Sequence, residues 1–522
     1  ITISIRFFLK YIYMLYKFDC RQPIAIYGAG KSGRDLLNAL NENFQYKPIL
    51  FLDDDIELSY TKINGLKVYR LDKALNKLKK MKINLVLLAL PSISQSKRIK
   101  IINKLEKFNL EFKTMPSMND LINGKAQIND INNVTIEEIL EREEVPSKPN
   151  LMKKNISDKV VLVTGSGGSI GSELCRQILK IGPKSLIYID NSEYSLYKID
   201  NEIKNYIIYY KLKFNVFPIL GSIQDKYFLE NLFKKYNIQT IYHAAAFKHV
   251  PLVELNIIEG IKNNVFGTKL IVNLSIKYCI QNFILISSDK AVRPTNYMGA
   301  TKRVAELICQ SASENQKKTI FSIVRFGNVL QSSGSVIPKF KKQIKEGGPV
   351  TLTHPEVTRY FMTITEASQL VIQAGAMSEG CEVFVLDMGK SVKIKDLIYK
   401  MIKLSGLTIK DTKNLDGDIE VKITGLSPGE KLYEELLIGD NPQKTYHERI
   451  QKAQDPFIPL EQLKIDLDNL YTMLEDNKIP DVKDMLNKLL PSYKSNSKIV
   501  DHIYEEKLNF KNDLKSPLIV NK

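Results

Sequence analysis

The segment 284–303, ILISSDKAVRPTNYMGATKR, holds the densest set of ionisable and hydroxyl side chains in the sequence. Its adjacent residues Asp289 and Lys290 directly follow an apolar run that is typical of a buried strand. A carboxyl and an amine side by side can act as general acid and general base on one substrate. Most adjacent charges form only a solvated loop pair, but the preceding strand and the nearby Lys302 favour a site here. Ser288 either bonds a substrate hydroxyl or caps the strand end.

Lys302 lies four residues after Met298, so the two side chains share one face of the predicted helix. Met298 has no proton to exchange. Tyr297 is adjacent in sequence, but a shift of one residue turns its side chain by about 100° around the helix, away from Lys302. Tyr297 is therefore the weaker candidate for a base.

A glycine-rich turn, TGSGGSIG, follows the apolar run VVLVT and precedes a helical pattern. Asp190 ends the next apolar run, 19 residues beyond Gly171. Such glycines let the backbone approach a pyrophosphate at the helix amino terminus, and the carboxylate accepts the ribose hydroxyls. The acid favours NAD over its 2′-phosphorylated form, because a carboxylate repels the phosphate. The NAD contacts predicted from this pattern are Gly165, Gly168, Ser169, Ile170, Gly171 and Asp190.

Further apolar runs at 214–220, 240–246, 283–288 and 319–327 alternate with amphipathic helical patterns. This alternation predicts a parallel sheet that is buried on both faces. In such open sheets the ligand binds at the carboxyl ends of the strands. We therefore expect the polar residues at those ends to converge on one cleft, namely His243, Ser288, Asp289, Lys290 and Asn328.

An earlier segment follows the same plan. PIAIYGAG, a helical pattern and PILFLDDD give strand, glycine turn, helix and strand, with Gly28, Gly30 and Gly33 in the turn and Asp53 at the end. NLVLLALP (84–91) predicts a further strand. A lone fingerprint is weak evidence, so ligand binding and a purely structural turn stand equal here. The expected fold class is α/β, with two Rossmann-like doubly wound parallel-sheet domains in series.

The expected domains are an N-terminal α/β domain over 21–112, a linker over 113–155 and a larger NAD-binding domain over 156–455. Residues 456–522 contain two amphipathic helical patterns, LEQLKIDLDNLYTMLE and VKDMLNKLL, and a Lys- and Asn-rich tail. Segment 1–20 is aromatic and basic, as is typical of a membrane interface, so we expect membrane association through it. A packed amphipathic helix is the alternative.

The chain has 522 residues, 44% of them hydrophobic and 25% charged, which excludes a peptide hormone, a fibrous protein and a disordered one. Its net charge of +17 comes from scattered lysines, so no focused basic patch favours nucleic acid. The five cysteines form no C-x-x-C pair and the five histidines no ligand spacing, so we expect no metal and a reducing compartment. No uncharged apolar run reaches the about 18 residues of a membrane span.

Six motifs carry a resemblance to a known family: TGSGGSIG, HAAAFKHVPLVE, SSDKAVRPTNYMGATKR, RFGNVLQSSGSVIP, TRYFMTITEA and GLSPGEKLYEELL. In this order they resemble the extended short-chain dehydrogenases/reductases, and within them the bacterial nucleotide-sugar 4,6-dehydratases of capsule and O-antigen biosynthesis. The chain looks like the long, membrane-attached branch that acts on UDP-N-acetylglucosamine, whose members carry Met298 where relatives have the Tyr of Tyr-x-x-x-Lys. Ser427 departs from the Arg that the family more often places near the pyrophosphate.

The resemblance implies an NAD-dependent lyase that takes hydride from carbon 4, eliminates water across carbons 5 and 6, and returns hydride to carbon 6. It implies that Asp289 is the general acid and Lys290 the base. Lys290 must then start neutral, and we expect burial and nearby positive charges to lower its pKa accordingly. Lys302 would hold the nicotinamide ribose, and Ala244 and Ala245 would also contact NAD.

Substrate binding is expected from Lys248, Asn328 and Arg359, because Lys and Arg suit a pyrophosphate and Asn can bond sugar hydroxyls or uracil. Each competes with a structural role as an ion pair or cap. The branch favours retention at carbon 5. The alternatives are an inverting dehydratase, a 4-epimerase, or a non-catalytic regulator that binds NAD or a nucleotide sugar. The resemblance further implies a homo-oligomer at the cytoplasmic face of the bacterial inner membrane.

Overall fold

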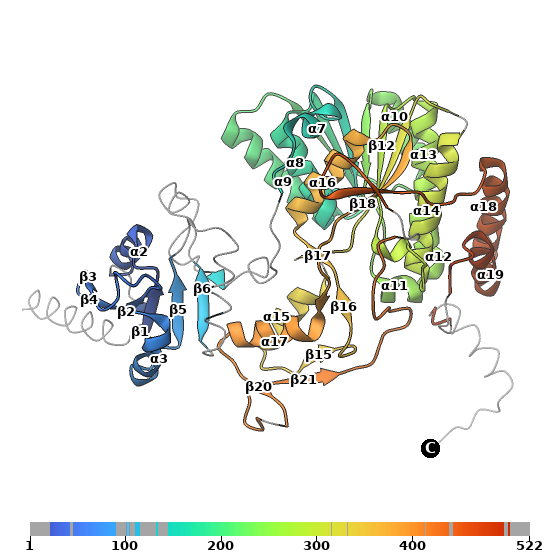
Figure 1. Cartoon of the computed structure of the whole chain (residues 1–522). Helices are drawn as coiled ribbons and strands as arrows, with labels where there is room; N and C mark the ends of the chain where they lie inside the picture. Colours follow the sequence, from blue (N-terminus) through green and yellow to red (C-terminus); the bar gives the residue numbers. More distant parts are fainter. Residues whose placement is uncertain are drawn as a thin grey trace, which may run out of the picture. The chain divides into compact units, whose positions relative to one another are not determined.

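The computed structural model describes residues 21–41, 45–89, 101, 104, 110–114, 132–133, 145–314, 316–330, 332, 334–412, 414–437, 442–494 and 499–501 (Figure 1). The expectations for segment 1–20, for most of the linker over 113–155 and for the tail after residue 501 lie outside these ranges. Within them, no helix combines the length and the apolar character that a membrane crossing requires.

The chain forms two compact units. The smaller unit comprises Ile1–Glu143, Lys339–Leu352 and Ile394–Ile423, and the larger one Glu144–Pro338, Thr353–Lys393 and Thr424–Lys522. This division differs from the expected boundaries, because two segments of the predicted range 156–455 group with the N-terminal residues.

The smaller unit is built on a sheet with strand order β3-β4-β2-β1-β5-β6-β7. Its inner pairs are parallel, and the edge pairs β3–β4 and β6–β7 are antiparallel. Leu36, Leu37 and Leu40 form the buried stripe of the first helix, as their spacing dictates. The strands predicted at PIAIYGAG, PILFLDDD and 84–91 are confirmed. The elements are β1 Gln22–Tyr27, α2 Lys31–Asn41, β2 Tyr46–Leu52, β3 Lys62–Ile63, β4 Leu66–Tyr69, α3 Leu71–Lys80, β5 Leu85–Leu88, β6 Glu111–Thr114 and β7 Asn132–Asn133.

The other segments of the smaller unit add a short sheet with order β15-β21-β20. Its pairs are parallel. The elements are α15 Val336–Lys345, β15 Val350–Leu352, α17 Ile394–Leu404, β20 Ile409–Lys410 and β21 Ile419–Ile423.

The larger unit contains a sheet with order β10-β9-β8-β11-β12-β13-β18-β23-β22. The strands from β10 to β18 are parallel, and β23 and β22 continue the sheet antiparallel. The strand order reverses at β8, which is where open α/β sheets bind their ligands. All four further runs predicted as strands are confirmed. The strands are β8 Val160–Thr164, β9 Ser185–Asp190, β10 Asn215–Leu220, β11 Thr240–His243, β12 Asn282–Ile286, β13 Ile320–Arg325, β18 Cys381–Leu386, β22 Gln443–Lys444 and β23 Ile450–Ala453.

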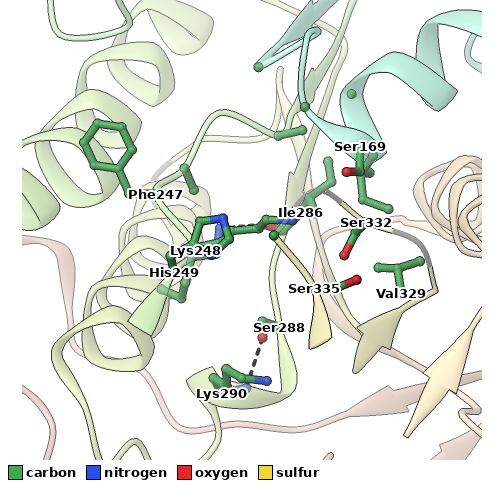
Figure 2. Close-up of a pocket in the computed structure, with 18 of the residues that line it drawn as sticks. Ser169, Phe247, Lys248, His249, Ile286, Ser288, Lys290, Val329, Ser332 and Ser335 are labelled. Carbon is green, nitrogen blue, oxygen red and sulfur yellow. Dashed lines mark hydrogen bonds between the residues drawn. The ribbon is translucent and has the colours of Figure 1, made fainter. Parts of the chain in front are cut away.

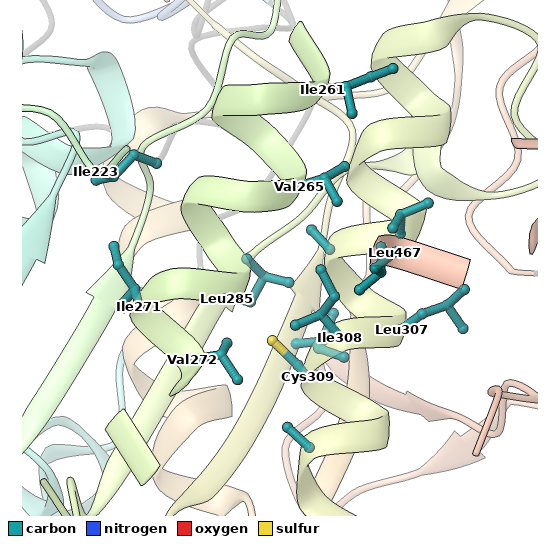
Figure 3. Close-up of a cluster of buried hydrophobic side chains, with 14 of the residues drawn as sticks. Ile223, Ile261, Val265, Ile271, Val272, Leu285, Leu307, Ile308, Cys309 and Leu467 are labelled. Atoms are coloured by element: carbon teal, nitrogen blue, oxygen red, sulfur yellow. The ribbon is translucent and has the colours of Figure 1, made fainter. Parts of the chain in front are cut away.

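Helices cover both faces of this sheet, as its largely apolar and buried inner strands require. One buried cluster lies against α8 and α16, and the other against α13 and α14. Figure 3 shows part of the second, to which Leu285 of β12 and Ile308 of α14 both belong. The predicted C-terminal helices are confirmed as α18 and α19. The helices are α7 Pro149–Lys154, α8 Ser169–Ile181, α9 Glu193–Tyr210, α10 Lys226–Lys235, α11 Val250–Leu255, α12 Ile257–Ile261, α13 Thr268–Lys277, α14 Tyr297–Glu314, α16 Ile364–Met377, α18 Leu460–Glu475 and α19 Ile479–Leu489.

A buried ionic network joins α14, β13 and the segment after β23. Arg325 is fully buried and its guanidinium donates to both Glu306 and Asp455. Burial alone would raise the pKa of Glu306, but the attraction of Arg325 and Arg303 outweighs it and lowers that pKa to about 2. The network therefore keeps Glu306 ionised. The Ser287 hydroxyl donates a hydrogen bond to the Glu306 carboxylate at 2.6 Å.

Arg325→Met is expected to destabilise the protein by about 3–5 kcal/mol, because two buried carboxylates lose one cation and are left with Arg303 alone. Denaturant unfolding measures this loss. Arg176→Met removes the half-exposed ion pairs with Glu173 and Glu202 and serves as the control, with an expected cost of about 1 kcal/mol or less. Equal losses in the two variants would contradict the stabilising role of the network.

Candidate functional site

The glycine turn between β8 and α8 is closely packed. Gly165 has φ of +67°, in the left-handed region, and a Cβ there would lie 2.7 Å from the Ala245 backbone. A Cβ on Gly171 would lie 2.0 Å from the Gly165 carbonyl oxygen. The turn therefore requires glycine at both positions, and it brings the start of α8, which begins at Ser169, to the carboxyl end of the sheet.

A cavity of about 940 Å³ opens at this end of the sheet. Its size suits a small-molecule ligand. In Figure 2, Lys248 and His249 lie on one side of it, Ser332 and Ser335 on the other, and Ser169 and Lys290 at different ends. The predicted site residues that line the cavity are Gly165, Gly168, Ser169, Ile170, Gly171, Ala244, Lys248, Ser288, Lys290, Lys302 and Asn328.

A smaller cavity of about 270 Å³ shares the glycine turn and contains Asp190 and Ala245 in its wall. The Asp190 carboxylate accepts hydrogen bonds from the backbone N–H groups of Gly167 and Ser192, both at 2.8 Å. These bonds fix its orientation beside the turn. A glycine cradle that any Cβ would fill, next to an anchored carboxylate, fits the pyrophosphate and ribose of a dinucleotide.

Lys302 and His243 are both buried, and only the first lines a cavity. The Lys302 Nζ donates to the Ile286 carbonyl at 2.6 Å. Burial lowers the pKa of Lys302 to about 8, against the opposing attraction of Glu306. The His243 ring bonds the hydroxyls of Thr164 at 2.7 Å and Thr268 at 3.0 Å, and burial lowers its pKa to about 3. His243 is therefore a neutral core residue, and the expectation that it joins the cleft is wrong.

Ser288, Asp289 and Lys290 form a hydrogen-bonded cluster after β12. The Ser288 hydroxyl donates to Asp289 Oδ1 at 2.9 Å, and the Lys290 Nζ donates to the same oxygen at 3.0 Å. Asp289 is fully buried and does not line the cavity, whereas Ser288 and Lys290 do. Asp289 thus reaches the cavity through its two neighbours, and the three residues are not a solvated loop pair.

The surroundings of Lys290 favour its protonated form, contrary to the neutral state that we expected. Burial lowers its pKa, but the attraction of Asp289 and Glu434 outweighs burial and raises the pKa above its ordinary value. The positive charge that lowers this pKa is that of Arg359, and the expected influence of Lys302 is not among the causes. Asn328 adds a contact, with its Oδ1 at 3.4 Å from Lys290 Nζ.

Arg359, which we expected to bind the substrate, contacts protein groups in this structure. It lies on β16 (Thr358–Arg359), is 8% exposed and does not line either cavity. Its guanidinium donates to the Thr358 and Leu432 carbonyls and to Glu430 at 3.1 Å. The alternative that we kept, a structural ion pair, therefore describes Arg359.

Tyr297 and Met298 lie away from both cavities. The Tyr297 ring lies 6.1 Å from that of Tyr493, and burial raises its pKa. Met298 belongs to the hydrophobic cluster of α13 and α14. The geometry thus agrees with the expectation that Tyr297 is turned away from Lys302.

Glu434 is the site residue that the sequence reasoning missed. It lies in the motif GLSPGEKLYEELL, and its Oε1 is 3.5 Å from the Lys290 Nζ. Only 3% of its side chain is exposed. The available signal was a carboxylate inside a motif rich in Leu, but its partner is 144 positions away in sequence and the pattern does not reveal it.

The parallel sheet, the glycine turn before α8, the acid at the end of β9 and the cavity lysine on α14 define an extended short-chain dehydrogenase/reductase domain. Residues 161–455 match the family described as "Polysaccharide biosynthesis protein". The chain belongs to this family.

The chain is 42% identical to "Capsular polysaccharide biosynthesis protein CapD" of Staphylococcus aureus, over 84% of this chain and 73% of that protein. It is 41% identical to "Probable polysaccharide biosynthesis protein EpsC" of Bacillus subtilis, over 81% of this chain and 69% of that protein. It is 28% identical to "UDP-N-acetylglucosamine 4,6-dehydratase (inverting)" of Campylobacter jejuni, over 60% of this chain and 87% of that protein.

Proposed function

We propose that this protein is an NAD-dependent nucleotide-sugar 4,6-dehydratase that acts on UDP-N-acetylglucosamine in surface polysaccharide biosynthesis. The observation that carries the proposal is the cluster of Ser288, Asp289 and Lys290, which opens into the same cavity as the glycine turn and Lys302. The relatives' names support the polysaccharide role, and that of the Campylobacter protein supports the reaction. Self-assembly and membrane association through segment 1–20 stay predictions from the resemblance.

NAD supplies a hydride acceptor and donor when bound, so that carbon 4 is oxidised and carbon 6 is later reduced. The residues that would hold it are Asp190 at the ribose, Lys302 at the nicotinamide ribose, and the start of α8 at the pyrophosphate. The remaining predicted contacts are Gly165, Gly168, Ser169, Ile170, Gly171, Ala244 and Ala245. Lys248 and Asn328 line the cavity beyond them and would bind the substrate.

In this mechanism Ser288 takes over the proton transfer from the sugar 4-hydroxyl, because Met298 stands where relatives have the Tyr of Tyr-x-x-x-Lys. Its hydroxyl lines the cavity and donates to the buried Asp289. As the sugar 4-hydroxyl loses its proton, Ser288 accepts it and passes its own proton to Asp289 Oδ1. Asp289 then holds the proton that the leaving group needs.

Once its ammonium proton has passed to another acceptor, Lys290 takes the carbon-5 proton, which is acidic when carbon 4 is a ketone. The proton held on Asp289 returns through Ser288 to the carbon-6 hydroxyl, which leaves as water. Lys290 finally returns its proton to carbon 5. Of the two protons removed from the sugar, one leaves in water and one is restored, so the product is the UDP-4-keto-6-deoxy sugar.

Incubation of the NAD-loaded chain with UDP-N-acetylglucosamine, followed by proton NMR, tests this function. We expect a 6-methyl doublet from a 4-keto-6-deoxy product with retained configuration at carbon 5. Inverted configuration at carbon 5 would instead assign the activity that the name of the Campylobacter relative states. Interconversion at carbon 4 alone, or no conversion, would overturn the dehydratase assignment.

Asp190→Ala is expected to lower NAD affinity about 10- to 100-fold, because a charge-assisted hydrogen bond to the ribose is lost. Isothermal titration of the cofactor-free protein measures the change. Asp53→Ala is the matched control, since Asp53 accepts the backbone N–H groups of Ala29 and Asp55 beside the other glycine turn in the same way. A larger loss from the Asp53 variant would place the NAD site in the smaller unit.

A further inference from the structure

Lys290 has a second buried carboxylate beside it that the steps above do not use. Glu434 Oε1 lies 3.5 Å from the Lys290 Nζ, and 3.8 Å from the Arg359 Nε on its other side. Glu434 does not line the cavity. It can therefore act on a substrate only through Lys290.

The segment that carries Glu434 is fastened to the loop that carries Lys290. The Lys431 Nζ donates to the Val292 carbonyl at 3.0 Å, and the Gly429 carbonyl accepts from Thr295 at 2.9 Å and from Asn296 at 3.0 Å. These hydrogen bonds hold the two segments next to each other. Glu434 is thus held beside Lys290 by contacts that do not involve either side chain.

Glu434 retains an unused proton-accepting atom. Its Oε2 is buried and makes no hydrogen bond to any residue that the structure describes. An unpaired carboxylate oxygen in a buried site is costly, and this one is free to accept a proton. The charged groups facing Lys290 are Asp289, Glu434 and Arg359, two anions and one cation.

Proton accounting identifies a gap in the proposed reaction. Lys290 begins as an ammonium, paired to Asp289 at 3.0 Å, and an ammonium cannot take the carbon-5 proton. Asp289 cannot accept the Lys290 ammonium proton at that stage, because it already holds the proton from the 4-hydroxyl. One more buried acceptor within reach of Nζ is required, and the geometry offers Glu434.

Resting on the proposed function, we propose that Glu434 is a positioning residue that takes the ammonium proton of Lys290 before carbon 5 is deprotonated. One N–H bond at Nζ breaks and one O–H bond forms on Glu434, and the electron pair left on Nζ then takes the carbon-5 proton. After Lys290 has returned that proton to carbon 5, Glu434 gives back its own. The ion pair seen in this structure is thereby restored, with no net gain or loss of protons.

The test is the rate at which deuterium from the solvent replaces the hydrogen at carbon 5, called wash-in below. NMR measures this rate from about pH 7 to about pH 9. With an internal acceptor, the wild-type rate is expected to change less than about twofold over this range. Glu434→Gln must lose the Lys290 proton to solvent, so its rate is expected to be about 100-fold lower near pH 7 and to rise about tenfold per pH unit. Glu434→Asp keeps a carboxylate and is expected to restore part of the flat profile.

Glu435→Gln is the matched control, because the neighbouring carboxylate pairs with Arg293 and Lys431 instead. It is expected to keep the flat wild-type profile. A flat profile in Glu434→Gln, or a tenfold rise per pH unit in the wild type, would overturn the role of Glu434 even if the first variant folds poorly. No wash-in and no dehydration by the wild type at any pH would overturn the proposed function itself.

Discussion

Lys290→Ala is expected to slow dehydration of UDP-N-acetylglucosamine about 10²- to 10⁴-fold and to stop deuterium wash-in at carbon 5, because the only amine at that end of the described cavity wall is lost. NAD affinity should stay unchanged, since Lys290 lies away from the glycine turn. The measurement is wash-in at carbon 5 of recovered sugar, together with product formation by NMR.

Lys269→Ala is the control for this result. Lys269 of α13 is paired with Asp468 of α18 and does not line the cavity, so its loss should leave both rates as in the wild type. Normal wash-in of deuterium by Lys290→Ala would contradict the assignment of Lys290 as the base. It would also overturn the proposal that Glu434 takes a proton from Lys290.

Ser288→Ala is expected to stop the reaction one step earlier, with a loss of about 10²- to 10⁴-fold. Without the hydroxyl that links the cavity to Asp289, the 4-hydroxyl keeps its proton and carbon 4 is not oxidised. Absorbance of the reduced nicotinamide in single-turnover experiments distinguishes this block from that of Lys290→Ala, in which oxidation can still occur.

Ser288→Thr retains the hydroxyl and is expected to recover most of the activity lost in Ser288→Ala. Asp289→Asn is expected to block at the same stage as Ser288→Ala, because the acceptor behind the hydroxyl is lost. Rapid nicotinamide reduction by Ser288→Ala would show that another group takes the 4-hydroxyl proton.

The sequence predicted the features that depend on local pattern. Apolar runs located the strands that were expected, and the glycine spacing with Asp190 located the turn whose close packing the structure shows. Lys302 was placed by the helical period. In each case the physical requirement is satisfied within a few residues, or between adjacent strands.

The remaining site features depend on contacts between distant segments. Arg359 is removed from the cavity by the carbonyl of Leu432 and by Glu430, over 70 positions further on. The charge of Lys290 depends on Glu434, which no local pattern connects to it. Burial of Asp289 could not be inferred either, since an Asp-Lys pair in sequence is equally compatible with an exposed turn.

The antiparallel strand β23 and Asp455 just after it have a consequence for biosynthesis. Arg325 of β13 can pair with Asp455 only after 130 further residues have been synthesised. Until that stretch has left the ribosome, the nascent sheet ends at β18 with an open edge, and Arg325 lacks one of its two carboxylates. The larger unit therefore completes its fold late in translation, and a chain truncated before β23 would expose an edge strand that invites aggregation.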